Sequence, residues 1–131
     1  YENSVAPVCY NGNLFTKSEM DNISTQFPNC SALMLGRGLI ADPGLVSGGT
    51  KRETLTAFTE ELLKTYIDVF GSERNAMFRL KENWFYLLNK FENSEKLGKR
   101  LRKTTDMDEF RSITREILET LPMRDNILPN L

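Results

Sequence analysis

Two glycine-bearing segments, each directly after an apolar run, have residue types that could bind a phosphate. Asn11-Gly12-Asn13 follows the run 5–10, and Gly36-Arg37-Gly38 follows the run 31–35. Glycines let a phosphate approach the backbone, amides at the start of a following helix donate to it, and Arg37 offers a bidentate positive charge. A single GRG triplet is explained equally well by a tight turn with a solvated arginine. The prediction of an anion site therefore depends on the pair of loops.

A second group of candidate residues is basic and lies mostly in the segment 94–103. Basic side chains on one exposed helix face could contact the phosphate backbone of a folded RNA. A solvated helix face is the competing interpretation. Two cations of the preceding helix could extend the same surface. The full set of candidate residues is Arg79, Lys81, Lys96, Lys99, Arg100, Arg102 and Lys103, for which the residues alone slightly favour the solvated face.

The composition excludes several kinds of catalytic centre. The 131 residues include no histidine and only two cysteines, which removes Ser-His-Asp and Cys-His pairs and the common zinc motifs. We therefore expect no metal site. With 17 basic and 18 acidic side chains, attraction to RNA must come from a local patch. No run of 18 apolar residues occurs, so we expect no membrane segment.

The two loops follow strands that the sequence predicts to belong to a βαβ unit. The runs 5–10 and 31–35 predict short buried strands, and Thr16 and Glu19 have the spacing of a capping box. A helix from there to Phe27, between two apolar strands, implies a parallel pair with a right-handed crossover. The alternative at Asn11-Gly12 is a two-residue hairpin. A short helical turn is expected near 39–41.

The βαβ unit is too small to form a stable sheet by itself. Two parallel strands need further strands and covering layers, so residues 1–46 are interpreted as part of a larger sheet or barrel. Paired loops after neighbouring strands match the phosphate site that follows the last two strands of a (β/α)8 barrel. In the isolated chain, exposed strand edges predict self-association or partial disorder of residues 5–46.

The positions of the two cysteines indicate whether the protein belongs in an oxidising or a reducing compartment. We place Cys9 near the end of the first strand and Cys30 just before the second, at opposite edges of a parallel pair. That arrangement separates them by about 13–17 Å at ~3.3 Å per residue. A disulfide needs Cα atoms within about 7 Å, so we expect free thiols and a reducing compartment.

The sequence of residues 51–131 predicts an all-α domain of four helices. A linker at 42–50 joins this domain to residues 1–46. The predicted helical domain holds 15 of the 17 basic residues and only two glycines. The expected apolar face of the first helix is Leu55, Phe58, Leu62, Tyr66 and Val69, and Gly71 ends this helix. The second helix, capped by Ser72, has the stripe Met77, Leu80, Trp84, Leu87, Leu88 and Phe91.

The last two predicted helices complete a small bundle. A short basic helix spans 94–103, and a final helix is capped near Asp106. The residues expected to be buried by the final helix are Phe110, Ile113, Ile117, Leu118 and Leu121. In the aromatic run 84–86, Trp84 belongs to the apolar stripe of its helix, and we expect Tyr86 alone to be exposed.

Three segments resemble tRNA-dihydrouridine synthases. The segment 7–16 resembles the strand and NGD-I-F-T loop of that family, and 32–43 resembles its M-I-G-R-G-x-x-x-N-P segment. The segment 79–88 is similar to the basic-aromatic helix of the family's C-terminal domain. Asn13 departs from the usual Asp, and Asp42 stands where Asn is common. The likeness covers nearly the whole chain.

The resemblance implies a flavoprotein that has an FMN-binding (β/α)8 barrel followed by a helical tRNA-binding domain. It implies that residues 11–13, Gly36 and Arg37 hold the FMN phosphate. The implied reaction is the NADPH-dependent reduction of uridine to dihydrouridine in tRNA, and the implied location of the protein is the cytoplasm. The family's catalytic cysteine is expected upstream of Tyr1. We therefore expect residues 1–131 alone to have no catalytic activity.

Two alternative functions remain. The segment 36–43 is also similar to FMN barrels of the ene-reductase type, although the basic helical tail argues against that group. The other alternative is a stand-alone helical module that binds RNA or protein, in which the βαβ unit serves only for oligomerisation. That alternative predicts RNA or protein binding without flavin.

Overall fold

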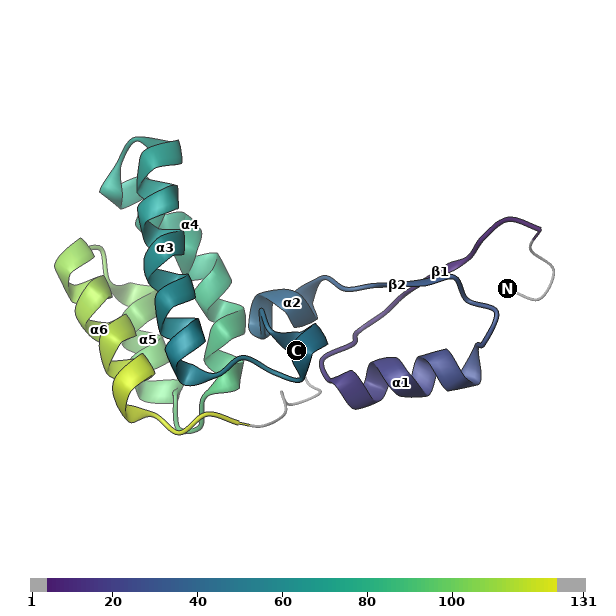
Figure 1. Ribbon diagram of the computed structural model, residues 1–131. Helices are drawn as coiled ribbons and strands as arrows, with labels where there is room; N and C mark the ends of the chain where they lie inside the picture. The colour runs from purple at the N-terminus through teal and green to yellow at the C-terminus, as the bar shows by residue number, and fades with distance from the viewer. Residues whose placement is uncertain (1–4, 125–131) are drawn as a thin grey trace.

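The chain folds into a mainly helical structure with one pair of parallel strands, as a computed structural model shows for residues 5–124 (Figure 1). The strand pair and the first helix lie at one end, and the helices of residues 52–120 lie at the other (Figure 1). In chain order the elements are β1 (Cys9–Asn11), α1 (Lys17–Gln26), β2 (Ala32–Met34), α2 (Arg37–Ala41), η1 (Leu45–Ser47), α3 (Arg52–Phe70), α4 (Glu73–Leu87), η2 (Leu88–Lys90), α5 (Glu95–Lys103) and α6 (Met107–Thr120).

The predicted βαβ unit is confirmed. β1 and β2 are parallel neighbours, with Cys9 opposite Ala32 and Asn11 opposite Met34. The alternative hairpin at Asn11-Gly12 is wrong, because the chain enters α1 instead of turning back. The Thr16 hydroxyl oxygen accepts the Glu19 amide at 3.1 Å, and this N-cap starts α1 too soon for a second strand.

The strand register corrects the expected separation of the cysteines. β1 begins at Cys9 instead of ending there, so Cys9 pairs with Ala32, only two residues beyond Cys30. Two residues span about 7 Å along a strand, so the cysteines lie at the same end of the pair. The Cys30 thiol lies 3.3 Å from the Val8 carbonyl oxygen, and both thiols are free.

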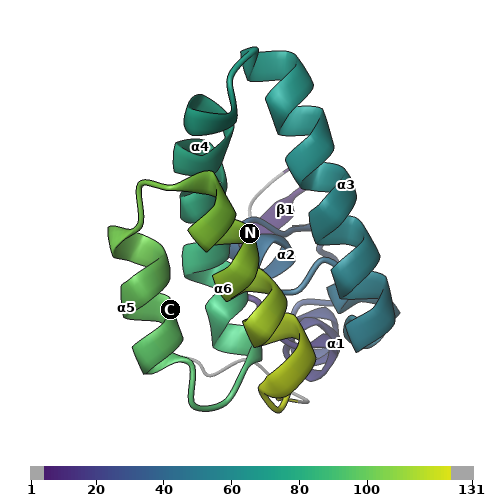
Figure 2. The ribbon, with the colours of Figure 1, turned by 90° about the vertical axis from the view of Figure 1, so that its left-hand side faces the viewer.

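The helical part has its own hydrophobic core. α3 packs on α4, and α6 packs on both α4 and α5 (Figure 2). The Arg52 guanidinium joins the start of α3 to the end of α6 by donating to the carbonyls of Leu118 and Leu121. The fully buried side chains at its centre are Leu55, Met77, Leu87, Phe91, Leu101, Phe110, Ile113 and Ile117.

The predicted stripe of α4 and buried face of α6 are confirmed, with Leu88 and Leu121 half-buried. Gly71 ends α3 at a φ of 65°, and Ser72 accepts the Asn75 amide, as the helix boundary predicted. Asp106 caps α6 by accepting the Glu109 amide.

The predicted face of α3 is partly wrong. Phe58 is 41% exposed and Val69 is 71% exposed, whereas Thr59 is buried. The Thr59 hydroxyl donates to the Thr56 carbonyl of its own helix, so burying it leaves no unsatisfied polar group. The buried face is therefore shifted by about one residue towards the side that meets α4.

The exposure expected within the aromatic run of α4 is also wrong. Trp84 is buried as predicted, but Phe85 is the exposed ring, at 59%. Tyr86 is half-buried because it packs against Phe15 and Ala41 of the front half. α2, which contains Ala41, lies on α4 and connects the two ends of the molecule.

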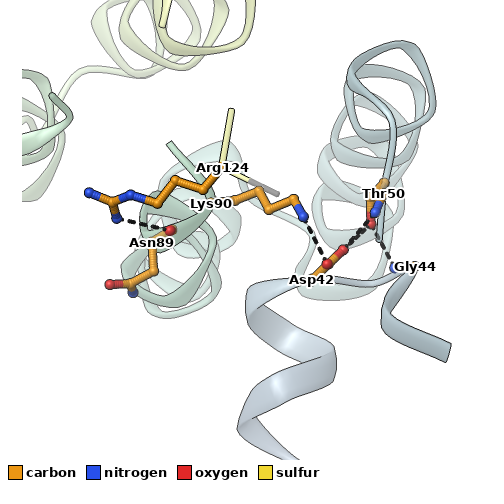
Figure 3. A network of polar contacts seen from close by, with 6 residues as sticks. All are labelled: Asp42, Gly44, Thr50, Asn89, Lys90 and Arg124. Atoms are coloured by element: carbon orange, nitrogen blue, oxygen red, sulfur yellow. Dashed lines mark hydrogen bonds and ion pairs between the residues drawn. The ribbon is translucent and has the colours of Figure 1, made fainter. Parts of the chain in front are cut away.

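The segment 42–50 is an ordered connection between the two halves (Figure 3). The buried Asp42 carboxylate accepts a hydrogen bond from the Lys90 ammonium at 2.9 Å and another from the Thr50 amide at 2.8 Å. The Thr50 hydroxyl also donates to Asp42 and accepts the Gly44 amide at 2.6 Å. This network ties the end of α2 to η2 at the end of α4.

Candidate functional site

The two glycine-bearing loops lie together at the carboxyl edge of the strand pair. Asn11 is opposite Met34 in the register, so both strands end at the same edge. The residue directly after the first loop touches the second loop, because a Cβ added to Gly38 would lie 2.1 Å from the Leu14 carbonyl oxygen. Only glycine permits that approach. The carboxyl edge points towards α2 and the helical part (Figure 1).

The loops present polar groups to solvent. Asn11, Asn13, Gly36 and Arg37 are all exposed. Gly12 is half-buried beneath the ring of Tyr10, where a Cβ would lie 2.5 Å from the phenolic oxygen. Asparagine amides, the backbone at the start of α2 and a guanidinium form a donor set that suits a phosphate. α2 is only five residues long, so we assign most of the attraction to the charge of Arg37.

The basic segment 94–103 forms an amphipathic helix with a solvent-facing basic side. Leu97, Gly98 and Leu101 are buried against the bundle. The exposed cations are Lys96, Lys99, Arg100, Arg102 and Lys103. We call these five the basic face of α5. The Arg100 guanidinium lies 3.9 Å from the Glu116 carboxylate, and both side chains are about half exposed, so this pair contributes little.

The structure separates the two cations that were predicted to extend this surface. Residues two apart on a helix point in different directions. The Lys81 ammonium donates to the Arg102 carbonyl at 3.2 Å and also to the Thr104 carbonyl, so it caps the end of α5. Arg79 instead points towards α3, with its guanidinium carbon 5.7 Å from the centre of the Phe70 ring. Lys81 therefore lies beside the basic face and Arg79 on the other side of α4.

The electrostatic environment of Lys81 differs from that of a free lysine. Burial of the ammonium, together with repulsion from Arg74, lowers the pKa of Lys81 below its usual value of 10.5. Its hydrogen bonds to two main-chain carbonyls fix its position. We therefore assign Lys81 a structural role at the junction of α4 and α5, next to the RNA surface that was predicted.

The residue pair that the sequence did not reveal is Asp42 and Lys90. Their side chains are each only 4% exposed, although both carry charge. Burial alone would raise the pKa of Asp42, but hydrogen bonds from Thr50 and Lys90 and the charge of Lys90 together lower it below 3.8. The sequence placed Asp42 in the linker 42–50 and in the segment 32–43 that resembles a known family, and nothing local pointed to a partner 48 residues away.

Two absences complete the description of residues 5–124. No three His, Cys, Asp or Glu side chains in this part lie where they could share a metal ion. None of its helices is both long enough and apolar enough to cross a bilayer.

Fold and site together define a mainly helical protein in which a parallel βαβ unit presents two polar loops towards a bundle with a basic face. Comparison with models of protein families, with curated proteins and with solved structures found no match to this chain.

Proposed function

We propose that this chain is the C-terminal part of an FMN-dependent tRNA-dihydrouridine synthase, which reduces uridine in tRNA with NADPH. The observation that carries the proposal is the contact between the two glycine-bearing loops at one carboxyl edge, facing the helical part. The resemblance of the segments 7–16 and 32–43 to that family supplies the identity of the cofactor and substrate.

In this proposal the loops hold the phosphate of FMN. Arg37 pairs with the phosphate charge, and the backbone of Gly36 and Gly12 allows close approach. Asn11 and Asn13 donate hydrogen bonds through their amides. Asn13 carries no negative charge, so it binds a phosphate without the repulsion that a carboxylate would add. FMN held there and reduced by NADPH would supply the hydride for the 5,6 double bond of uracil.

The basic face of α5 supplies contacts to tRNA in this proposal. Its five exposed cations would neutralise backbone phosphates and position the RNA without reading its sequence. Binding through such contacts weakens steeply as the salt concentration rises.

The cofactor role is tested in the longer protein that contains this segment. We expect that protein to be yellow and to form dihydrouridine in tRNA in the presence of NADPH. Arg37→Ala should lower its FMN affinity at least about tenfold, because a charge-assisted bidentate contact is lost. Arg115→Ala, an exposed arginine of α6, is the matched control and should leave FMN affinity unchanged. A colourless protein, or one that reduces only small enones, would contradict the proposal.

The separate core of the helical part favours a second candidate function, an RNA- or protein-binding module that does not use flavin. The main hydrophobic cluster contains residues between 55 and 123 only. This candidate predicts that the chain binds tRNA equally well when Arg37 is replaced by alanine and FMN is absent. A gel-shift titration against tRNA at two salt concentrations measures this. Binding that does not weaken with salt would argue against phosphate contacts by α5.

A further inference from the structure

An open cleft lies where α3 and α4 meet, at the turn between them. It is lined by Phe70 of α3 and by Asn75, Phe78, Arg79 and Glu82 of α4, and has a volume of about 460 Å³. Each of the two phenylalanines is 40% exposed. Single exposed phenylalanines are common at protein surfaces. Two in one polar cleft provide an apolar ring surface next to hydrogen-bonding groups.

Cations lie against both rings. The Arg79 guanidinium reaches across to Phe70, and the Phe78 ring has Arg74 at 5.1 Å and Lys81 at 4.8 Å from its centre. Phe70 also meets the Tyr66 ring edge-on, at 5.5 Å between centroids. Positive charges therefore lie over part of the faces of both rings, next to the ring surface that stays exposed.

We propose that this cleft binds an unpaired nucleobase of an RNA strand. The base stacks on the exposed ring surface of Phe70 and Phe78 and on the guanidinium of Arg79, as unpaired bases stack on aromatic and arginine side chains. The amide of Asn75 and the carboxylate of Glu82 bind its edge. Arg74 lies where it can contact an adjacent phosphate. The proposal rests on the RNA-binding function proposed above and gives that function a second subsite.

The composition of the cleft favours a nucleobase over a simple anion. Glu82 would repel inorganic phosphate, whereas a carboxylate accepts the N–H donors that base edges present. The two phenyl rings have no role in binding a phosphate. A nucleotide uses all three kinds of group, because it combines an aromatic face, a polar edge and a phosphate.

Lys81 joins the Phe78 side of the cleft to the end of α5. The Lys81 ammonium lies 4.8 Å from the centre of the Phe78 ring and 3.2 Å from the carbonyl oxygen of Arg102. Arg102 and Lys103 are exposed at that end of α5. A strand whose phosphates follow the basic face therefore passes Phe78, where an unpaired base can enter the cleft.

The test compares single-stranded and paired RNA on the whole chain. The probes are a short fluorescein-labelled oligouridine and a fluorescein-labelled, blunt-ended RNA duplex, and the readout is fluorescence anisotropy. Phe70→Leu and Phe78→Leu should each weaken binding of oligouridine about tenfold, with an unchanged salt dependence, since stacking is not a phosphate contact. Binding of the paired duplex should stay the same. Phe78→Tyr should bind oligouridine as the wild type does.

Phe58→Leu is the matched control, because Phe58 is 41% exposed on α3 and does not line the cleft. Circular dichroism checks that each variant is folded. If the Phe70 and Phe78 variants bind oligouridine like the wild type, while Lys99→Glu/Arg102→Glu abolishes binding, the nucleobase site is wrong and the phosphate surface stands. If the wild type binds neither RNA, the proposed RNA-binding function fails as well.

Discussion

At the scale of single residues, the buried Asp42–Lys90 pair joins charged side chains from the two halves of the chain. Removing charges from water is costly, and a buried ion pair is tolerated only where further hydrogen bonds satisfy it. Here Thr50 supplies them through its amide and hydroxyl. Within the described residues no buried side-chain nitrogen or oxygen lacks a partner. The pair therefore fixes the geometry of the connection between the halves.

Breaking one side of this pair should destabilise the fold strongly. Lys90→Met leaves the Asp42 carboxylate buried without its cation, and we expect a loss of about 3–5 kcal/mol in the free energy of unfolding. The double variant Asp42→Asn/Lys90→Met should be more stable than Lys90→Met alone, since it leaves no buried charge. Urea denaturation measures both values. Equal stability of the single and double variants would contradict the role assigned to the ion pair.

The lowered pKa of Asp42 predicts a pH dependence with a definite sign. A carboxyl group whose pKa is lower in the folded than in the unfolded state contributes stability above its unfolded pKa. That contribution is lost as the pH falls below about 4 towards the folded pKa. In urea titrations between pH 7 and pH 3, the wild type should lose more stability than Asp42→Asn. An equal loss in both proteins would exclude Asp42 as a source of acid sensitivity.

At the scale of secondary-structure elements, the sequence predicted those features that depend on residues close together in the chain. Thr16, Ser72 and Asp106 cap the three helices for which they were proposed, because capping is a contact within one turn. The faces of α4 and α6 follow from their periodicity. The α3 face could not be placed, since the choice between Phe58 and Thr59 depends on which side α4 occupies. The strand register depends on tertiary packing for the same reason.

The candidate site was predictable to the same extent. The polar loops share an edge because parallel strands must end at the same side. The distant partners of Asp42 and Lys81 could not be anticipated, because each contact joins residues that only the complete fold brings together. The aromatic cleft was missed because Phe70 and Phe78 were not part of any predicted stripe.

The contact between the two loops gives a prediction at this scale. Gly38→Ala places a methyl group 2.1 Å from the Leu14 carbonyl, which must force the loops apart. We expect a destabilisation of about 1–3 kcal/mol, as for other overpacked sites. Gly36→Ala is the control, because a Cβ there meets nothing within 4 Å. Thermal unfolding of both variants checks this. A Gly38 variant as stable as the Gly36 variant would show that the loops do not touch.

At the scale of the whole molecule, the front half is poorly covered. The strands show an exposed, half-buried, exposed pattern, and Met34 is 55% exposed. Among residues 5–124, β1 pairs only with β2, so each strand has a free edge. The helical part, in contrast, surrounds its own core. The two halves thus differ in how completely their apolar surface is buried. The strand pair is the part whose apolar surface and free edges a neighbouring strand or layer would cover.

Because free strand edges pair readily with other chains, we expect the isolated chain to self-associate through β1 and β2. The molecular mass from light scattering should rise with protein concentration. Met34→Lys, which puts a charge on the exposed strand, should shift the association midpoint to at least about tenfold higher concentration. Val46→Lys is the control, since Val46 is 57% exposed in η1 and lies outside the strands. A compact monomer at all concentrations would show that the strand pair is stable without a neighbour. It would also remove this support for interpreting the front half as part of a larger barrel.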